Sequence, residues 1–200
     1  LWLEERRFAF AYKKKVVCAS ITLKEVVERA FPNSRPMLEV ITPGVDSVPG
    51  PATPDAKAEA RRALGVSTDV PILLFVGNDF VKKGLKTLLE AMAHIEGKVE
   101  LLVVGRSEKA KEYEQQAANL GLRSRIHFLG SLKDMSLAYR AADMLVHPTL
   151  EDSYGMVVLE GMAHGLPVLV SDAPFSGIAR DLTAGSNALL LTEPEDTVGL

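Results

Sequence analysis

The sequence predicts an α/β fold, a Rossmann-like parallel sheet with helices on both faces. Continuous aliphatic runs recur along the chain, and helix-like stretches separate them. Strands buried on both faces have continuous apolar runs, and their alternation with helices is typical of parallel sheets. The expected strands are 16–20, 38–42, 71–77, 99–105, 125–130, 143–148, 166–171 and 187–192. The expected helices are 23–31, one from 56 that Gly65 closes, 84–96, 108–120, 133–142, 155–164 and 174–183.

The chain is divided by a Pro/Gly-rich segment, "PGVDSVPGPATPDA", at residues 43–56. Such a composition marks a linker or a domain boundary. The last residues, "TEPEDTVGL", resemble a helix start with Pro194 near the first helical position and acids in the first turn. We therefore expect a fragment of a longer protein.

Charge and cysteine content limit the function classes. The net charge of −3 gives no reason to expect a nucleic-acid partner. The single cysteine, Cys18, excludes an internal disulfide framework, fits a reducing compartment and is expected to be a buried hydrophobe. The run Lys13–Lys15 lies in a basic stretch, residues 1–40. It suits either a peripheral contact with an anionic membrane face or a solvated helix end.

Candidate ligand groups follow the predicted strands. In open parallel sheets, ligands bind outside the carboxyl ends of the strands. Gly77, Gly105 and Gly130 each end a strand, where a glycine admits a ligand or another backbone, or makes a plain turn. Lys82 and Lys83 precede a helix N-terminus, and together they predict an anion site. Solvated surface lysines are the alternative.

The stretch "EDSYGMVVLEGMAHG" holds the second group of candidates. A purely structural alternative for Asp152 or Ser153 is to cap the helix that begins near Gly155, and Gly155 permits close approach of a diphosphate to the helix amides. Glu160 lies inside this apolar helix, where a buried carboxylate needs a partner. A ribose diol would satisfy it; a solvent-exposed position on an amphipathic helix is the alternative.

The histidines do not indicate a metal site. His94, His127, His147 and His164 lack metal-ligand spacing. His147 precedes Pro148 at a strand end, so it is a candidate to line the cleft. The absence of a GxGxxG segment argues against an NAD site.

Several motifs together resemble the retaining glycosyltransferases of family 4, which have the GT-B architecture of two Rossmann-like halves. "DSYGMVVLE" is similar to their acid-x7-Glu signature, "VGNDFVKKG" to their phosphate-binding segment, and "VITPGVD" to the segment that ends the first half. "RIHFLG", "AADMLVHPT" and "EGMAHGLPVLVSD" also match. Within the family, "DFVKKG" and "TPG" most resemble lipopolysaccharide core glucosyltransferases that act on heptose.

The resemblance implies a domain division and site roles. Residues 1–46 would close the N-terminal acceptor domain and form the hinge, and 47–200 would be the donor-binding domain, truncated at its C-terminus. Lys83 and Lys82 would neutralise the donor's diphosphate, Asp152 would contact the donor sugar, and Glu160 would bind the ribose. Lys83 and Asp152 are the expected catalytic residues. The remaining donor-binding positions would be Gly77, Gly105, Phe128, Leu129, Gly130 and Ser131 (with the base at 128–131), and Ser153, Tyr154, Gly155 and Met156.

The implied function is transfer of a hexose, glucose from UDP-glucose, with retention of configuration and without a metal or other cofactor. The implied acceptor is a lipopolysaccharide core or related lipid-linked glycan at the cytoplasmic membrane face, bound by the missing N-terminal domain, so this fragment alone is expected to be inactive. The first signature acid is usually Glu but is Asp152 here, with Glu151 one position early, and Pro43 replaces the usual Asn. An inactive sugar-nucleotide binding module and a nucleotide-sugar epimerase of related fold are the alternatives.

Overall fold

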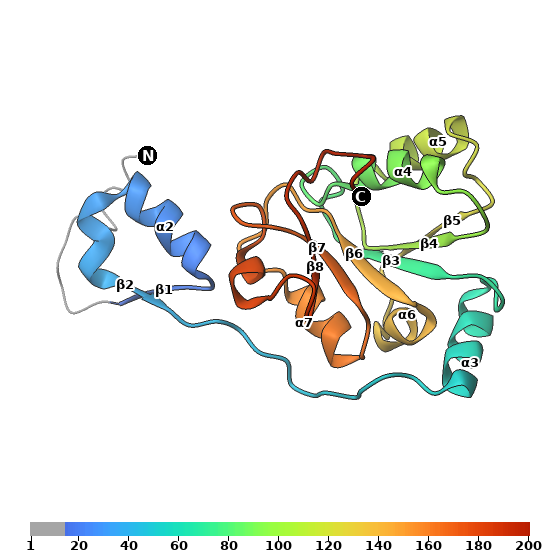
Figure 1. Cartoon of the computed structure of the whole chain (residues 1–200), viewed down its shortest axis with the longest axis horizontal. Coiled ribbons are helices and arrows are strands. Elements are labelled where there is room, and N and C mark those ends of the chain that lie inside the picture. Colours follow the sequence, from blue (N-terminus) through green and yellow to red (C-terminus); the bar gives the residue numbers. More distant parts are fainter. Residues whose placement is uncertain (1–14) are drawn as a thin grey trace.

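A six-stranded, all-parallel sheet forms the centre of the protein, which a computed structural model describes for residues 15–200 (Figure 1). The strand order is β5-β4-β3-β6-β7-β8. The chain starts in the middle at β3, moves outward to β5, and returns to β6 on the other side of β3. Every pair in this sheet is parallel. The strands are β3 (Ile72–Val76), β4 (Glu100–Val104), β5 (Ile126–Gly130), β6 (Met144–His147), β7 (Val168–Ser171) and β8 (Leu189–Leu191).

Helices cover both faces of the sheet, as the continuous apolar strands predict (Figure 1). One core joins Ile72 and Leu74 of β3 to helices α3 (Pro54–Leu64), α6 (Ser136–Ala141) and α7 (Met156–Ala163). The opposite core joins Phe75 of β3 to α4 (Leu85–His94) and α5 (Ala110–Asn119). The predicted α/β class, a Rossmann-like parallel sheet with helices on both faces, is therefore confirmed.

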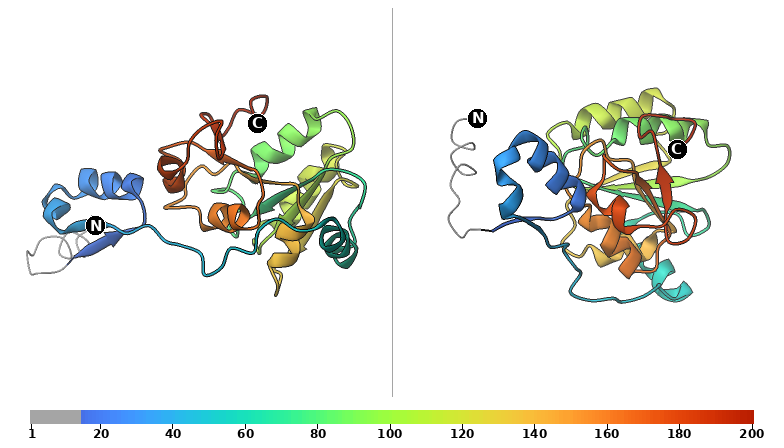
Figure 2. Two further views of the ribbon diagram at one scale, coloured as in Figure 1. Left: turned by 60° about the horizontal axis from the view of Figure 1, so that its bottom comes forward. Right: turned by 60° about the vertical axis from the view of Figure 1, so that its left-hand side comes forward.

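A small unit precedes the sheet domain (Figure 2). It contains two parallel strands, β1 (Val16–Cys18) and β2 (Leu38–Val40), with α2 (Ile21–Ala30) and the 3-10 helix η1 (Pro32–Met37) between them. Cys18 is buried and free, as expected for a small apolar residue. The Ser20 hydroxyl accepts from the Leu23 amide at 3.0 Å and donates to the Ser153 carbonyl at 2.7 Å, so the cap of α2 also contacts the sheet domain.

An extended segment connects the two parts and passes along α7 (Figure 1). The Gly50 amide donates to the Ala163 carbonyl at 2.9 Å. A Cβ on Gly165 would lie 2.9 Å from Pro51 Cβ, so glycine is needed where the segment crosses the end of α7. The segment is therefore packed against the helix that carries Glu160.

Two predicted helices are wrong. The range 174–183 contains only the five-residue 3-10 helix η2 (Gly177–Asp181). Backbone groups that an α-helix would need are paired elsewhere: the Phe175 carbonyl accepts from Asp152, and the Gly177 amide donates back to the Asp152 carbonyl. After Pro194 the chain makes turns, and the Asp196 side chain accepts from the Val198 amide at 2.9 Å. The expected strand 38–42 is limited to β2, while the other strand predictions agree with the structure to within a few residues.

No helix within residues 15–200 has the length and apolar character needed to cross a membrane. Lys15 is exposed and pairs with Glu39 at 2.6 Å. Lys13 and Lys14, which carried the membrane-contact interpretation, lie outside the described residues.

Candidate functional site

The site is built at the carboxyl ends of β3 and β6, the two strands where the chain reverses its direction across the sheet. In doubly wound sheets this position is the usual ligand-binding crevice. The loop after β3 carries Lys83, and the loop after β6 carries Asp152. The two loops are joined by backbone: the Lys82 carbonyl accepts from the Leu150 amide at 2.7 Å and from Thr149 Oγ1 at 3.0 Å.

Lys83 lies against the loop that follows β6. Its Nζ is 2.7 Å from Asp152 Oδ2 and 3.3 Å from the Glu151 carbonyl. An ammonium group has three donors, so these two contacts leave one for a ligand. Its stem lies over Gly77, where a Cβ would be 2.8 Å from Lys83 Cγ, so a side chain at position 77 would push this lysine away.

Lys82 and Glu151 form a second, more exposed pair at 2.9 Å. The hydrogen bond and charge of Glu151 raise the pKa of Lys82. A pair this exposed contributes little to stability because water and salt screen it. Lys82 is therefore free to exchange Glu151 for another anion.

Asp152 accepts from three protein groups. Oδ2 is 2.7 Å from Lys83 Nζ and 3.0 Å from His147 Nε2, and Oδ1 accepts from the Tyr154 amide at 3.3 Å. Burial alone would raise the pKa of Asp152, but the hydrogen bonds from His147 and Lys83 outweigh it and hold the pKa well below its usual range. Asp152 is therefore a carboxylate at neutral pH.

His147 ends β6 and is buried, with 1% of its surface exposed. Burial lowers its pKa, against the opposing effect of Asp152. A neutral ring that donates from Nε2 leaves Nδ1 as an acceptor, and Nδ1 is buried without a partner among the described residues. The sequence indicated His147 only as a candidate cleft residue, whereas the structure places it behind Asp152.

The N-terminus of α7 presents unpaired amides. Gly155 is the N-cap residue with φ 106°, and no side chain caps the helix. The structural alternative, a cap by Asp152 or Ser153, is wrong: neither side chain accepts from the first amides of α7, and the Asp152 carboxylate is held by Lys83, His147 and the Tyr154 amide. The amides of Gly155, Met156 and Val157 have no acceptor within the part of the chain described here. Such a helix end attracts anions.

Glu160 lies one turn after Met156 on the same face of α7. Both residues line a cavity of about 240 Å³ whose other wall is the connecting segment, Gly44–Ser47. The Tyr139 hydroxyl of α6 donates to Glu160 Oε2 at 2.5 Å. Glu160 therefore already has a protein partner, which the sequence analysis missed because α6 and α7 meet only in the folded chain.

The other predicted donor-binding residues lie at neighbouring strand ends. The Gly77 amide donates to the Val104 carbonyl, and the Gly105 amide donates to the Gly130 carbonyl, both at 2.9 Å. Gly105 has φ 134°, and a Cβ there would lie 1.9 Å from the Gly77 carbonyl oxygen, so close backbone approach alone requires this glycine. The donor-binding roles of Gly77 and Gly105 stay predictions.

The segment predicted to hold the base is at the end of β5, two strands from β3. Phe128 and Leu129 pack against opposite cores, so their side chains belong mainly to the fold. Gly130 and Ser131 are exposed. Tyr154 is buried, and its hydroxyl donates to Asp181 at 3.1 Å; burial and this contact raise its pKa to about 12. Among residues 153–156, the Tyr154 side chain is therefore committed to the fold, whereas Ser153 and Met156 are exposed.

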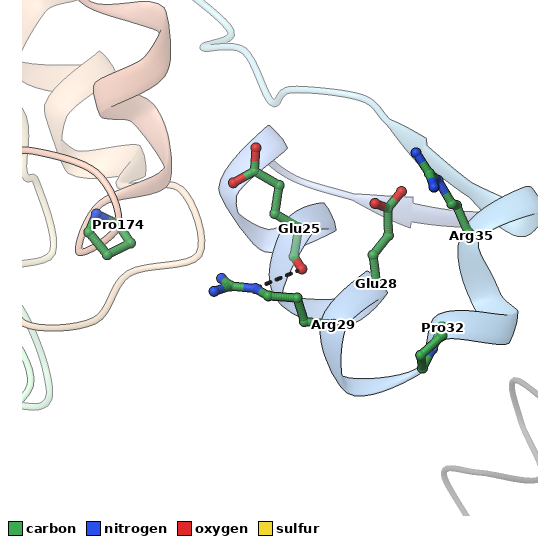
Figure 3. A pocket seen from close by; sticks show the side chains of 6 residues that line it. All are labelled: Glu25, Glu28, Arg29, Pro32, Arg35 and Pro174. Carbon is green, nitrogen blue, oxygen red and sulfur yellow. Dashed lines mark hydrogen bonds between the residues drawn. The ribbon is translucent and has the colours of Figure 1, made fainter.

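A larger cavity, of about 620 Å³, is lined by other residues (Figure 3). Its walls are Glu25, Glu28, Arg29, Pro32 and Arg35 of the small unit and Pro174 of the sheet domain. None of the predicted site residues lines it. Within residues 15–200, no three His, Cys, Asp or Glu side chains are grouped so that they could hold a metal ion.

These features define a Rossmann-like domain that gathers lysines and free helix amides at its topological switch point. The chain belongs to the glycosyl transferases group 1 family, whose family model matches residues 56–198. The predicted family is thereby confirmed.

The relatives include enzymes of bacterial glycan synthesis. The lipopolysaccharide glucosyltransferase WaaG of Escherichia coli (strain K12) is 29% identical over 196 residues, which cover 94% of this chain and 52% of that protein. A crystal structure of WaaG superposes with a TM-score of 0.82 at 25% identity, covering 94% of this chain and 52% of that one. The crystal structure of Anabaena Alr3699/HepE in complex with UDP-glucose has a TM-score of 0.83 at 25% identity. The match covers 95% of this chain and 53% of that one. The chain thus spans about half the length of these relatives.

Proposed function

We propose that this chain is the donor-binding half of a retaining hexosyltransferase that takes glucose from UDP-glucose. Residues 47–200 form the donor domain, and residues 1–46 close an N-terminal acceptor domain and form the hinge. The arrangement of Lys83 beside the uncapped N-terminus of α7 carries the proposal, because both attract the diphosphate of a nucleotide sugar. The likeness to a UDP-glucose complex supports the choice of donor.

The proposed chemistry places positive charge where negative charge develops. When the bond between the sugar C1 and the β-phosphate oxygen breaks, the electron pair stays with UDP, which becomes more negative. Lys83, with Lys82 beside it, and the amides of Gly155 and Met156 stabilise this leaving group without reorganising. No metal ion or other cofactor is needed in this scheme, because these fixed groups supply the positive charge.

Two carboxylates are assigned to the donor's hydroxyl groups. Glu160 accepts from the ribose diol, and the base lies over the backbone of residues 128–131. Asp152 contacts the sugar through the acceptor capacity that its three protein contacts leave. Its charge is held in place by Lys83 and His147, which suits a carboxylate one methylene shorter than the usual Glu.

The acceptor is assigned from the relatives alone. Similarity to the WaaG glucosyltransferase supports a lipopolysaccharide core or related lipid-linked glycan, reached at the cytoplasmic face of the membrane. The acceptor and its catalytic groups would be held by the other half of the protein, so this chain alone is expected to bind the donor without transferring the sugar.

Calorimetric titration of this chain with UDP-glucose and with UDP, in the presence of EDTA, tests the proposal. We expect binding with a Kd between about 10 μM and 1 mM, because half of the cleft is missing. Ligand linkage should also raise the melting temperature at millimolar UDP. Binding that appears only after Mg²⁺ or Mn²⁺ is added would contradict the metal-independent scheme, and no binding of either ligand would contradict the donor assignment.

A further inference from the structure

The carboxylate assigned to the ribose is anchored by a buried tyrosine. Tyr139, on α6, is 2% exposed, and its hydroxyl is 2.5 Å from Glu160 Oε2 on α7. Burial and the contact with Glu160 raise the pKa of Tyr139, so the phenol keeps its proton and donates a hydrogen bond to the carboxylate. Oε1 of Glu160 has no hydrogen-bond partner in residues 15–200 and remains available.

Tyr139 is itself held in place by a residue at the end of α7. Its ring stacks on His164, with centroids 4.7 Å apart and an angle of 23° between the planes. His164 Nδ1 is 2.8 Å from the backbone carbonyl of Glu160. His164 thus fixes the ring of Tyr139 against the backbone of α7, and the Tyr139 hydroxyl in turn restrains the Glu160 carboxylate through Oε2.

The position of Glu160 at a cavity wall makes restraint of its side chain useful for binding. Glu160 is half-buried at the wall of the 240 Å³ cavity between α7 and the connecting segment. A glutamate side chain has three rotatable bonds, so an unrestrained carboxylate would lose conformational freedom when it bound a diol. Restraint before binding removes this loss and increases affinity.

We infer that Tyr139 is a positioning residue for the ribose, acting through Glu160 without touching the ligand. The inference rests on the proposed function, since it requires that Glu160 binds the ribose diol. The tyrosine leaves Oε1 and the unused lone pair of Oε2 to accept from the 2′ and 3′ hydroxyls. Nucleotides that lack these hydroxyls should not depend on Tyr139.

Calorimetric titration with UDP and with 2′,3′-dideoxy-UDP separates positioning from folding. The wild-type chain should bind UDP more tightly than the dideoxy analogue. Tyr139→Phe keeps the ring and its stacking, so we expect a UDP affinity about three- to tenfold lower and an unchanged affinity for the analogue. In a Glu160→Ala background, Tyr139→Phe should have no further effect on UDP binding, because the two residues act as one unit.

Tyr113→Phe is the matched control, since Tyr113 is also buried but lies on α5 in the opposite core. It should leave both affinities at the wild-type values. The inference would be overturned if Tyr139→Phe lost the same affinity for UDP as for the analogue, or lost affinity for neither. In that case a wild-type chain that prefers UDP would still support the role of Glu160. A wild-type chain that binds both nucleotides equally would overturn the ribose assignment and the inference together.

Discussion

At the scale of single residues, Asp152 is the centre of the site. A lysine, a buried histidine and a backbone amide all donate to its two oxygens. A half-buried carboxylate is stable only when its charge is satisfied in this way. The Asp152 carboxylate is held by His147 from behind, and it keeps Lys83 at the crevice.

His147 should make the stability of the chain depend on pH. Its pKa in the folded protein is lowered by burial, whereas in the unfolded chain it is about 6.5. Below that pH the unfolded state binds the proton more readily than the folded state does. The stabilising effect of the neutral His147 is therefore complete above about pH 6.5, and the free energy of unfolding falls as the pH drops below it. The free energy of unfolding therefore rises with pH, and this rise is the slope that His147 contributes. We expect His147→Gln, which can still donate to Asp152, to reduce the slope by up to about 1.4 kcal/mol per pH unit.

Urea unfolding at pH 7, 6 and 5 measures this slope. His94→Gln is the control, because it removes an exposed histidine of α4 and leaves His147 in place. The low pKa of Asp152 keeps its own titration below the range from pH 5 to pH 7. A His147→Gln variant with the wild-type slope would show that His147 takes up a proton freely in the folded state.

Residue types at strand ends could be predicted from the sequence, but their partners could not. The place of Lys83 after a buried strand predicts an anion site, whereas the role of Asp152 in the same site follows only from the resemblance to the glycosyltransferase family. Tyr139 was overlooked because it lies inside a helix pattern, where an aromatic residue indicates a core position. Its hydroxyl does need a partner when buried, which is the one signal that the sequence offered. That the partner is Glu160 depends on how α6 and α7 pack.

At the scale of elements, the loop before α7 is fixed by backbone pairing with residues 175–178, at the start of η2. Asp152 exchanges hydrogen bonds with Phe175 and Gly177, and the Ile178 amide donates to the Tyr154 carbonyl at 2.7 Å. These contacts take the groups that a helix at 174–183 would need, and they fix the turn that leads into α7. The helix pattern was misleading because local periodicity does not register pairing with residues that lie far away in sequence.

Substitution of Gly105, which follows β4, should destabilise the fold because its backbone lies against that of Gly77. Gly105→Ala places a Cβ 1.9 Å from the Gly77 carbonyl oxygen at φ 134°, so both strain and overlap oppose it. We expect the free energy of unfolding to fall by at least about 2 kcal/mol. Chemical denaturation of the variant measures this loss.

Gly121→Ala is the comparison for Gly105→Ala. Gly121 also has positive φ, at 73°, but a Cβ there has no atom within 4 Å. It should show only the cost of the backbone conformation, about 1 kcal/mol. Equal losses in the two variants would mean that the strand ends move apart and that the contact between residues 77 and 105 is not needed.

At the scale of the whole molecule, sheet topology brings the site together. Lys83 and Asp152 are 69 residues apart in sequence, yet β3 and β6 are neighbours, so the loops after them meet. α7 then directs its free amides to the same edge, and the connecting segment passes Glu160 on its way to α3 (Figure 1). The alternation of strands and helices predicted this sheet, while the path of the segment over α7 had no signal in its Pro/Gly-rich composition.

The most direct test of the account compares UDP with uridine on Lys83→Ala by calorimetry. Lys86→Ala is the control, since Lys86 is exposed on α4 and pairs with Glu90 at the surface of that helix. If Lys83 binds the diphosphate, its loss should weaken UDP binding by about 1.5–3 kcal/mol, the scale of a charge-assisted hydrogen bond. Uridine, which has no phosphate, should bind as it does to the wild type. Equal weakening of UDP and uridine, or unchanged UDP binding, would contradict the assignment of this site to the donor diphosphate.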